Sequence, residues 1–129
     1  ILETSTDPRS CQTGGPWHPA GDDWGKAVRT DVTTRMMAAE LQSPDPRLLG
    51  QRWSEVLNIK LGEDDAGHPV LRLENAVLRF VTAEDNRGEG LAALDLQVVD
   101  RDHIFKEATA RGCKVDGDTV HVCGMRFRV

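Results

Sequence analysis

The sequence predicts an α+β fold made of two tandem βαβββ modules. Three observations lead to this fold. The chain has 129 residues, which suits one domain of ordinary size. Two segments with the apolar spacing of a helix each follow an aspartate that can cap a helix. Segments typical of strands and helices also follow one another in the same order twice.

The first module is predicted over residues 30–83. Residues 30–42 are rich in Val, Thr and Met, which is typical of a strand. Asp45 and Pro46 match an N-cap and a first helical position, and the apolar stripe that follows ends near Asn58. Three short strands complete the module, at residues 59–63, 69–73 and 76–81, with a turn at residues 74–75.

The second module is predicted over residues 90–129. Residues 91–99 are typical of a strand, and Asp100 can cap a helix that carries Ile104, Phe105 and Ala108. Gly112 suits the left-handed end of this helix. Three short strands follow, at residues 114–116, 119–123 and 125–129.

The two modules also share sequence letters. Residues 38–45 and 93–100 both read Ala-x-acidic-Leu-Gln-x-x-Asp, and both run from a strand into a helix cap. Leu78-Arg79-Phe80 likewise matches Met125-Arg126-Phe127 in the last strand of each module. Such internal similarity indicates duplication and predicts a pseudo-twofold axis.

Residues 1–29 differ from the rest of the chain. They are rich in proline and glycine and keep no period of a helix or a strand. We expect an extended arm or linker whose tryptophans, Trp17 and Trp24, pack on the domain or on a partner chain. The chain starts at Ile1 without a targeting segment, so we expect a fragment or a processed product.

Charge and cysteine usage exclude several classes of partner and site. The formal charge of −5 argues against nucleic acid or an anionic membrane surface as a partner. No apolar run reaches the roughly 20 residues of a membrane span. Three cysteines without a Cys-x-x-Cys spacing argue against a disulfide framework or a zinc ribbon and favour a cytoplasmic location. Cys113 and Cys123 are expected to be small buried residues of strands.

Two further segments carry a resemblance to a known family. Residues 52–58, Arg-Trp-Ser-Glu-Val-Leu-Asn, resemble the "fYrdvLG" segment of the vicinal oxygen chelate superfamily, and residues 91–100 with 110–112 resemble its "HvafrVdD…arGv" signature. The resemblance covers residues 30–129 and is nearest to glyoxalase-like and bleomycin-resistance-like domains of unassigned activity. It implies a U-shaped mixed sheet with helices on the convex face and a ligand on the concave side.

The resemblance also implies where a metal would bind. First-strand ligands of the superfamily fall at Ala38 and Ala93, and last-strand ligands fall near Arg79 or Val81 and near Arg126 or Arg128. An alanine methyl group has no lone pair, and arginine is a cation, so neither residue type coordinates a metal. We therefore expect no metal and no other cofactor in this chain.

Strand alternation identifies the candidate cleft residues. If Leu41 and Leu96 face their helices, the polar residues beside them face the cleft together with arginines of the last strands. Arg79 is taken as the repeat mate of Arg126. His121, which alternates with two valines, is a further candidate, whereas His18, His68 and His103 are interpreted as loop or surface residues. The predicted ligand-binding cleft comprises Glu40, Gln42, Asp95, Gln97, Arg79, Arg126, Arg128 and His121.

Two interpretations of these cleft residues remain open. Glu40 and Asp95 could pair with the arginines in a network that closes the sheet, because buried carboxylates need partners. Alternatively, one carboxylate could serve as a general base or as the group that holds a ligand.

Three functions follow from this composition of the cleft. The first is a metal-independent domain that binds a small molecule. The second is a metal-dependent isomerase or lyase whose site is completed by another module or chain. The third is a structural module whose role is to pair with another chain or module. For all three functions we expect a homodimer, because domains of the superfamily that the chain resembles commonly pair.

Overall fold

The computed structural model describes residues 7–11, 15–16 and 20–129, which form two compact units, Ile1–Thr30 and Asp31–Val129. The first unit contains two short 3-10 helices, Pro8–Cys11 and Trp24–Ala27. The indole N–H of Trp24 donates a hydrogen bond to the carbonyl oxygen of Gly15 at 2.7 Å. Trp17 and His18 lie outside the described residues, so the expectations for them stay predictions.

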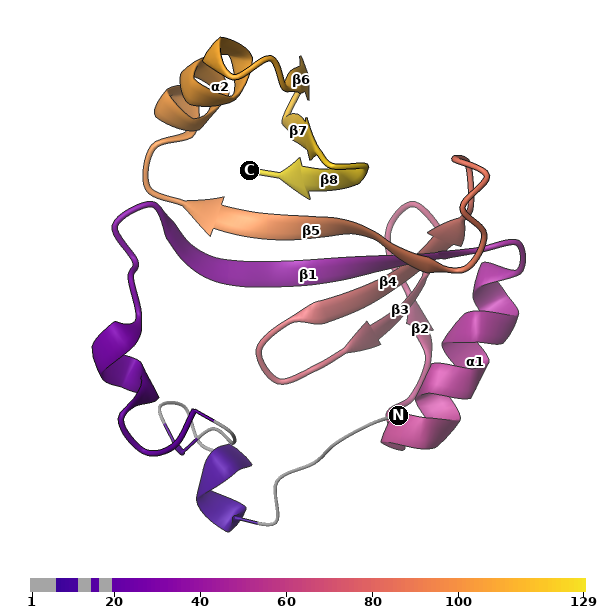
Figure 1. Ribbon diagram of the computed structural model, residues 1–129. Coiled ribbons are helices and arrows are strands. Elements are labelled where there is room, and N and C mark those ends of the chain that lie inside the picture. Colours follow the sequence, from indigo (N-terminus) through magenta and orange to yellow (C-terminus); the bar gives the residue numbers. More distant parts are fainter. Residues whose placement is uncertain (1–6, 12–14, 17–19) are drawn as a thin grey trace. The chain divides into compact units, whose positions relative to one another are not determined.

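The second unit is an open mixed sheet of eight strands with two helices, as the sequence predicts (Figure 1). The strand order is β2-β3-β4-β1-β5-β8-β7-β6, so each βαβββ module forms one half of the sheet. The elements are β1 (Thr33–Ser43), α1 (Pro46–Leu57), β2 (Gly62–Glu63), β3 (Pro69–Arg72), β4 (Val77–Thr82), β5 (Gly90–Val98), α2 (Arg101–Ala110), β6 (Lys114–Asp116), β7 (Thr119–Val122) and β8 (Met125–Arg128).

The central pair of strands carries the pseudo-twofold relation. β1 and β5 run antiparallel, and each pairs in parallel with the last strand of its own module. Ala38 lies opposite Asp95 and Glu40 lies opposite Ala93. This pairing is symmetric when residues 38–45 are matched to residues 93–100, which confirms the predicted equivalence of the two segments.

The predicted mate of Arg79 is wrong. Arg79 lies opposite Glu40, whereas the residue opposite Asp95 in the second module is Arg128. Arg126 lies opposite Ala93 and corresponds to Val77. A match of three letters does not determine strand register, which depends on how the whole strand pairs with its neighbours.

Both helices begin where the sequence predicts. The side chain of Asp45 accepts a hydrogen bond from the backbone N–H of Leu48 at 2.9 Å, and Asp100 accepts one from His103 at 2.9 Å. Helix α1 ends at Asn58, which has a left-handed backbone (φ 54°). A short polar side chain tolerates this conformation, which explains why the helix stops there.

The cysteines of the second module are less buried than expected. Cys113 is half-buried and Cys123 is exposed. The strand predicted over residues 119–123 ends at Val122, and Cys123 (φ 50°) lies in the turn between β7 and β8. This position in a turn accounts for its exposure.

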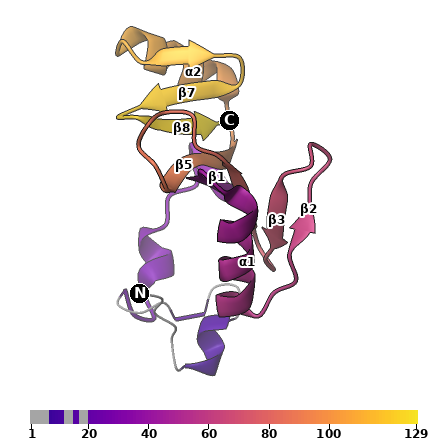
Figure 2. The ribbon, with the colours of Figure 1, turned by 90° about the vertical axis from the view of Figure 1, so that its right-hand side faces the viewer.

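The two helices pack against opposite ends of the sheet (Figure 2). Helix α1 packs on β3, β4 and β1 and covers a core formed by Leu49, Leu71 and Phe80. Helix α2 packs on β6, and its buried residue is Ala108. Because side chains alternate along β4, the residues next to Phe80, including Arg79, face the side of the sheet away from α1. Among the described residues, no helix is long and apolar enough to cross a membrane.

The core under α1 should be the most sensitive part of the fold. Phe80 is 0% exposed, so Phe80→Ala should leave a cavity and lower the free energy of unfolding by about 3–5 kcal/mol. Val56 on α1 is 65% exposed, so Val56→Ala should change it by less than about 0.5 kcal/mol. Urea denaturation measures both variants. An equal loss in the two would contradict the assigned core.

Candidate functional site

Glu40 lies at the centre of the sheet, on the face away from α1. It is 3% exposed, with Arg79 of β4 opposite it on one side and Ala93 of β5 on the other. A carboxylate this deeply buried requires charged or hydrogen-bonding partners, because transfer out of water otherwise strongly favours its neutral form.

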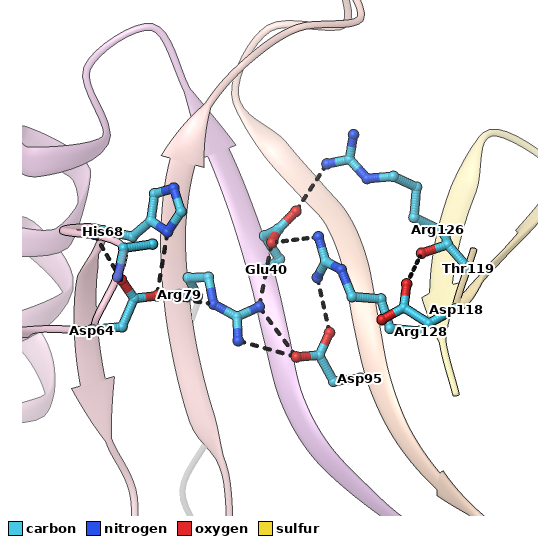
Figure 3. A network of polar contacts seen from close by, with 10 residues as sticks. Glu40, Asp64, His68, Arg79, Asp95, Asp118, Thr119, Arg126 and Arg128 are labelled. Atoms are coloured by element: carbon cyan, nitrogen blue, oxygen red, sulfur yellow. Dashed lines mark hydrogen bonds and ion pairs between the residues drawn. The ribbon is translucent and has the colours of Figure 1, made fainter. Parts of the chain in front are cut away.

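Three arginines supply these partners (Figure 3). Oε1 of Glu40 is 2.9 Å from Nη2 of Arg126. Oε2 is 2.8 Å from Nη2 of Arg128 and 3.3 Å from Nη1 of Arg79. Arg79 belongs to the first module and the other two arginines belong to the second, so Glu40 links both halves of the sheet.

Asp95 is the counterpart of Glu40 on β5 and makes a second bridge. Its Oδ1 is 2.9 Å from Nη1 of Arg128, and its Oδ2 is 3.1 Å from Nη2 of Arg79. Arg79 and Arg128 therefore each contact both carboxylates. These contacts agree with the interpretation of a network that closes the sheet, and we call Glu40, Asp95, Arg79, Arg126 and Arg128 the central network.

The network favours the charged form of Arg128. Burial by itself lowers the pKa of the Arg128 guanidinium, but the contacts with Asp95 and Glu40 outweigh burial and raise that pKa above its ordinary value. The positive charge of Arg128 is therefore permanent at physiological pH.

Asp64 and His68 extend the network at its β4 side. Oδ2 of Asp64 lies 3.4 Å from Nε of Arg79 and 3.2 Å from Nδ1 of His68. Its Oδ1 accepts hydrogen bonds from the backbone N–H groups of Ala66 and His68. Burial raises the pKa of Asp64, but these hydrogen bonds outweigh it and hold the pKa below its ordinary value.

The sequence interpretation of His68 as a loop residue missed this contact. Nδ1 of His68 is within hydrogen-bond distance of the Asp64 carboxylate and donates to it in the tautomer that carries the proton on Nδ1. The available signal was an aspartate placed before a glycine and a histidine in a tight turn, Asp64 to His68, where aspartate commonly binds backbone N–H groups.

A pocket of about 430 Å³ adjoins the central network. Its charged and polar walls come from both modules, and Pro46, Pro69 and Val81 are apolar residues of its lining. The lining residues are Glu40, Pro46, Gly67, His68, Pro69, Phe80, Val81, Thr82, Glu84, Arg126 and Arg128.

Three of the predicted cleft residues lie outside the central network. Gln42 is 1% exposed, and its amide donates to Asp85 Oδ1 at 2.6 Å and to the Gly88 carbonyl at 3.0 Å, so it holds the connection between the modules. Arg87 and Gln42 hold the pKa of Asp85 well below its ordinary range. Gln97 is exposed, although its repeat mate is buried.

His121 occupies the expected face of the sheet. It is half-buried and lies opposite Arg126 in the pairing of β7 with β8, so both side chains share a face. It does not line the pocket beside the central network.

The residues at the ligand positions implied by the superfamily do not fit a metal. Ala38 and Ala93 are buried and offer methyl groups. The nearby carboxylates of Glu40 and Asp95 are engaged by guanidinium cations, which would repel a metal ion. In the part of the chain that the structure describes, no group of three or more His, Cys, Asp or Glu residues could hold a metal ion.

Removing the central carboxylate should destabilise the fold. Glu40→Gln leaves three neighbouring cations facing a neutral amide, so the free energy of unfolding should fall by about 3 kcal/mol, the lower end for a broken buried pair. Glu55→Gln on the exposed side of α1 should change it by less than about 0.5 kcal/mol.

A double variant separates charge imbalance from lost packing. Combining Glu40→Gln with Arg126→Gln removes one of the uncompensated cations, so its loss of stability should be smaller than the sum of the two single losses. Urea denaturation of all four proteins measures the difference. Strict additivity would show that the contact between Glu40 and Arg126 contributes nothing.

Asp64 should contribute to the acid sensitivity of the fold. Its pKa is lower in the folded chain than its ordinary value of 3.8. The ionised group therefore stabilises the fold fully above that value, and this contribution is lost as the pH falls towards the folded-state pKa. Asp64→Asn should show a smaller loss of unfolding free energy between about pH 6 and about pH 3 than the unmodified chain. Asp65→Asn, at the exposed neighbouring position, should keep the original difference, and identical profiles for all three would contradict the assignment.

The fold has clear counterparts among solved structures. A xylose isomerase-like TIM barrel/4-hydroxyphenylpyruvate dioxygenase fusion protein matches with a TM-score of 0.61 at 17% identity, over 78% of this chain and 20% of that protein. A mutant of 4-hydroxymandelate synthase from Streptomyces coelicolor matches with a TM-score of 0.58 at 19% identity, over 74% of this chain and 36% of that protein. This chain thus spans a minor part of both proteins.

A smaller counterpart is covered almost completely. Methylmalonyl-CoA epimerase from Mycobacterium tuberculosis matches with a TM-score of 0.55 at 14% identity, over 78% of this chain and 89% of the epimerase. No protein-family model and no curated protein matches the sequence. At these identities the likeness shows a shared fold, and it assigns no activity, substrate or cofactor to this chain.

Proposed function

We propose that residues 31–129 form a metal-independent, glyoxalase-like domain that binds a small molecule in the pocket beside the central network. The observation that carries this proposal is the pocket itself. Its volume of about 430 Å³ suits a small ligand, and its walls combine permanent cations with apolar surface.

The donor set supports binding without a metal. A metal in this fold would need N, O or S donors where this chain has Ala38 and Ala93. Positive charge in the pocket comes from Arg126 and Arg128 instead, and a guanidinium keeps its charge at every physiological pH. In this proposal the arginines attract the ligand by their charge and by their N–H donors.

The ion pairs support a preformed site. Each carboxylate of the central network contacts at least two arginines, so the arginines beside the pocket are held in place before a ligand arrives. A ligand then does not have to order these long side chains, which lowers the entropic cost of binding.

Binding with and without a chelator tests this function. A library of polar small molecules, screened by thermal shift, should yield compounds that raise the melting temperature equally with and without EDTA. Metal analysis of the purified protein should find less than stoichiometric transition metal. One bound equivalent that is needed for ligand binding would instead favour the metal-dependent isomerase or lyase.

A blocking variant locates the binding site. Thr82 lies at the pocket wall, so Thr82→Trp should fill the entrance and abolish the shift. Thr109→Trp, on the exposed side of α2, should keep it. A screen without binders would favour the structural pairing module, and binders insensitive to Thr82→Trp would place the site elsewhere.

The location of the chain and its assembly are part of the same proposal. The odd number of cysteines favours the cytoplasm, and a homodimer stays a prediction that size-exclusion chromatography with light scattering tests.

A further inference from the structure

The three arginines of the central network are unequally compensated. Arg79 contacts Asp64, Glu40 and Asp95, and Arg128 contacts Glu40 and Asp95. Arg126 has one ion pair, through Nη2 to Oε1 of Glu40. Glu40 is shared with both other arginines, so Arg126 is the arginine with the fewest carboxylate contacts.

Arg126 also has hydrogen-bond donors to spare. A guanidinium carries five N–H donors, and Nη2 of Arg126 is the nitrogen engaged in this structure. Its Nε is buried and, within the described part of the chain, has no hydrogen-bond partner. A buried donor without an acceptor is costly, so a ligand that offers oxygen atoms here would relieve that cost as well as provide attraction.

The surroundings of Arg126 favour an anion. Its neighbours in register are Ala93 on one side and His121 on the other. The row continues to Lys114 beyond His121 and to Glu40 beyond Ala93, so Glu40 is the one carboxylate among these cross-strand neighbours of Arg126. Lys114 pairs with Asp116 at 3.3 Å and therefore adds little net charge.

The other carboxylates of the pocket leave this position open. Glu40 is already engaged, and Glu84 is an exposed residue of the lining. Of the two arginines that line the pocket, Arg126 therefore has fewer ion pairs than Arg128.

We propose that Arg126 is the anion-binding residue of this pocket, and that the ligand carries a carboxylate or a phosphate group. This inference rests on the proposed function, because it places the ligand in the same pocket. Arg126 donates to two oxygen atoms of the anion through its free N–H groups while Nη2 keeps its bond to Glu40. Arg128 also lines the pocket and adds attraction, and the apolar part of the ligand rests on the prolines of the lining.

Titration with simple anions tests the proposal. Succinate and inorganic phosphate represent the two groups, and succinamide is the neutral counterpart of succinate. Isothermal titration at low salt should give saturable binding of at least one anion and much weaker binding of succinamide. Comparison of the two anions shows which group the pocket prefers, and failure of both to bind would overturn the proposal.

Variants assign the binding to Arg126. Arg126→Gln should weaken the preferred anion at least about tenfold, as expected for a lost charge-assisted pair. Arg126→Lys keeps the positive charge but loses the planar set of guanidinium donors. Its affinity for the anion should therefore lie between those of the unmodified chain and Arg126→Gln. Arg111→Gln, whose native side chain is 77% exposed and pairs with Glu107, should leave the affinity unchanged. Equal affinities for all variants would overturn the proposal.

An NMR measurement gives an independent readout. The Nε–H signal of Arg126 should move on anion addition in the unmodified chain, because that donor lacks a partner before binding. A signal that stays in place while the anion binds elsewhere would overturn the assignment.

The outcomes also separate this inference from the proposed function. If neutral compounds bind in a manner that Thr82→Trp abolishes but Arg126→Gln does not affect, the pocket function stands and the anion inference fails. If neither neutral compounds nor anions bind, both fail.

Discussion

The antiparallel pairing of β1 with β5 is the constraint on which the rest of this structure depends. It places Glu40 and Asp95 on adjacent strands and on the same face, with alanines opposite them. Two carboxylates this close repel each other unless cations lie between them. Arg79 from one module and Arg128 from the other contact both, so the duplicated halves are joined by charge as well as by hydrogen bonds.

The same arrangement places ion pairs at the centre of the sheet. Methyl groups at Ala38 and Ala93 leave room for the longer side chains two positions further along each strand, Glu40 and Asp95. Buried acids and bases of this kind are costly to assemble but rigid once paired. The centre of the sheet is therefore occupied by the protein's own charges, and space for a ligand remains beside it, in the pocket lined by Arg126 and Arg128.

The two modules share topology but not packing. Helix α1 covers a core with Leu71 and Phe80, whereas α2 buries Ala108. Gln42 is buried beneath the connection between the modules, and its repeat mate Gln97 is exposed. Arg126 has no arginine counterpart in the first module, where Val77 stands. The anion site that we propose thus arises from a departure from the internal symmetry.

The sequence alone determined the local structure of this protein. Asp45, Asp100 and Asn58 mark helix ends because capping depends on neighbouring residues, and the repeated strands follow from alternation and from the internal match. Strand alternation also selected Glu40, Asp95 and the arginines. Only the tertiary structure decided that Arg128 rather than Arg126 mirrors Arg79, that Gln42 binds a loop, and that Asp64 and His68 join the network. These outcomes depend on register and on contacts between residues far apart in the chain, where no local pattern acts.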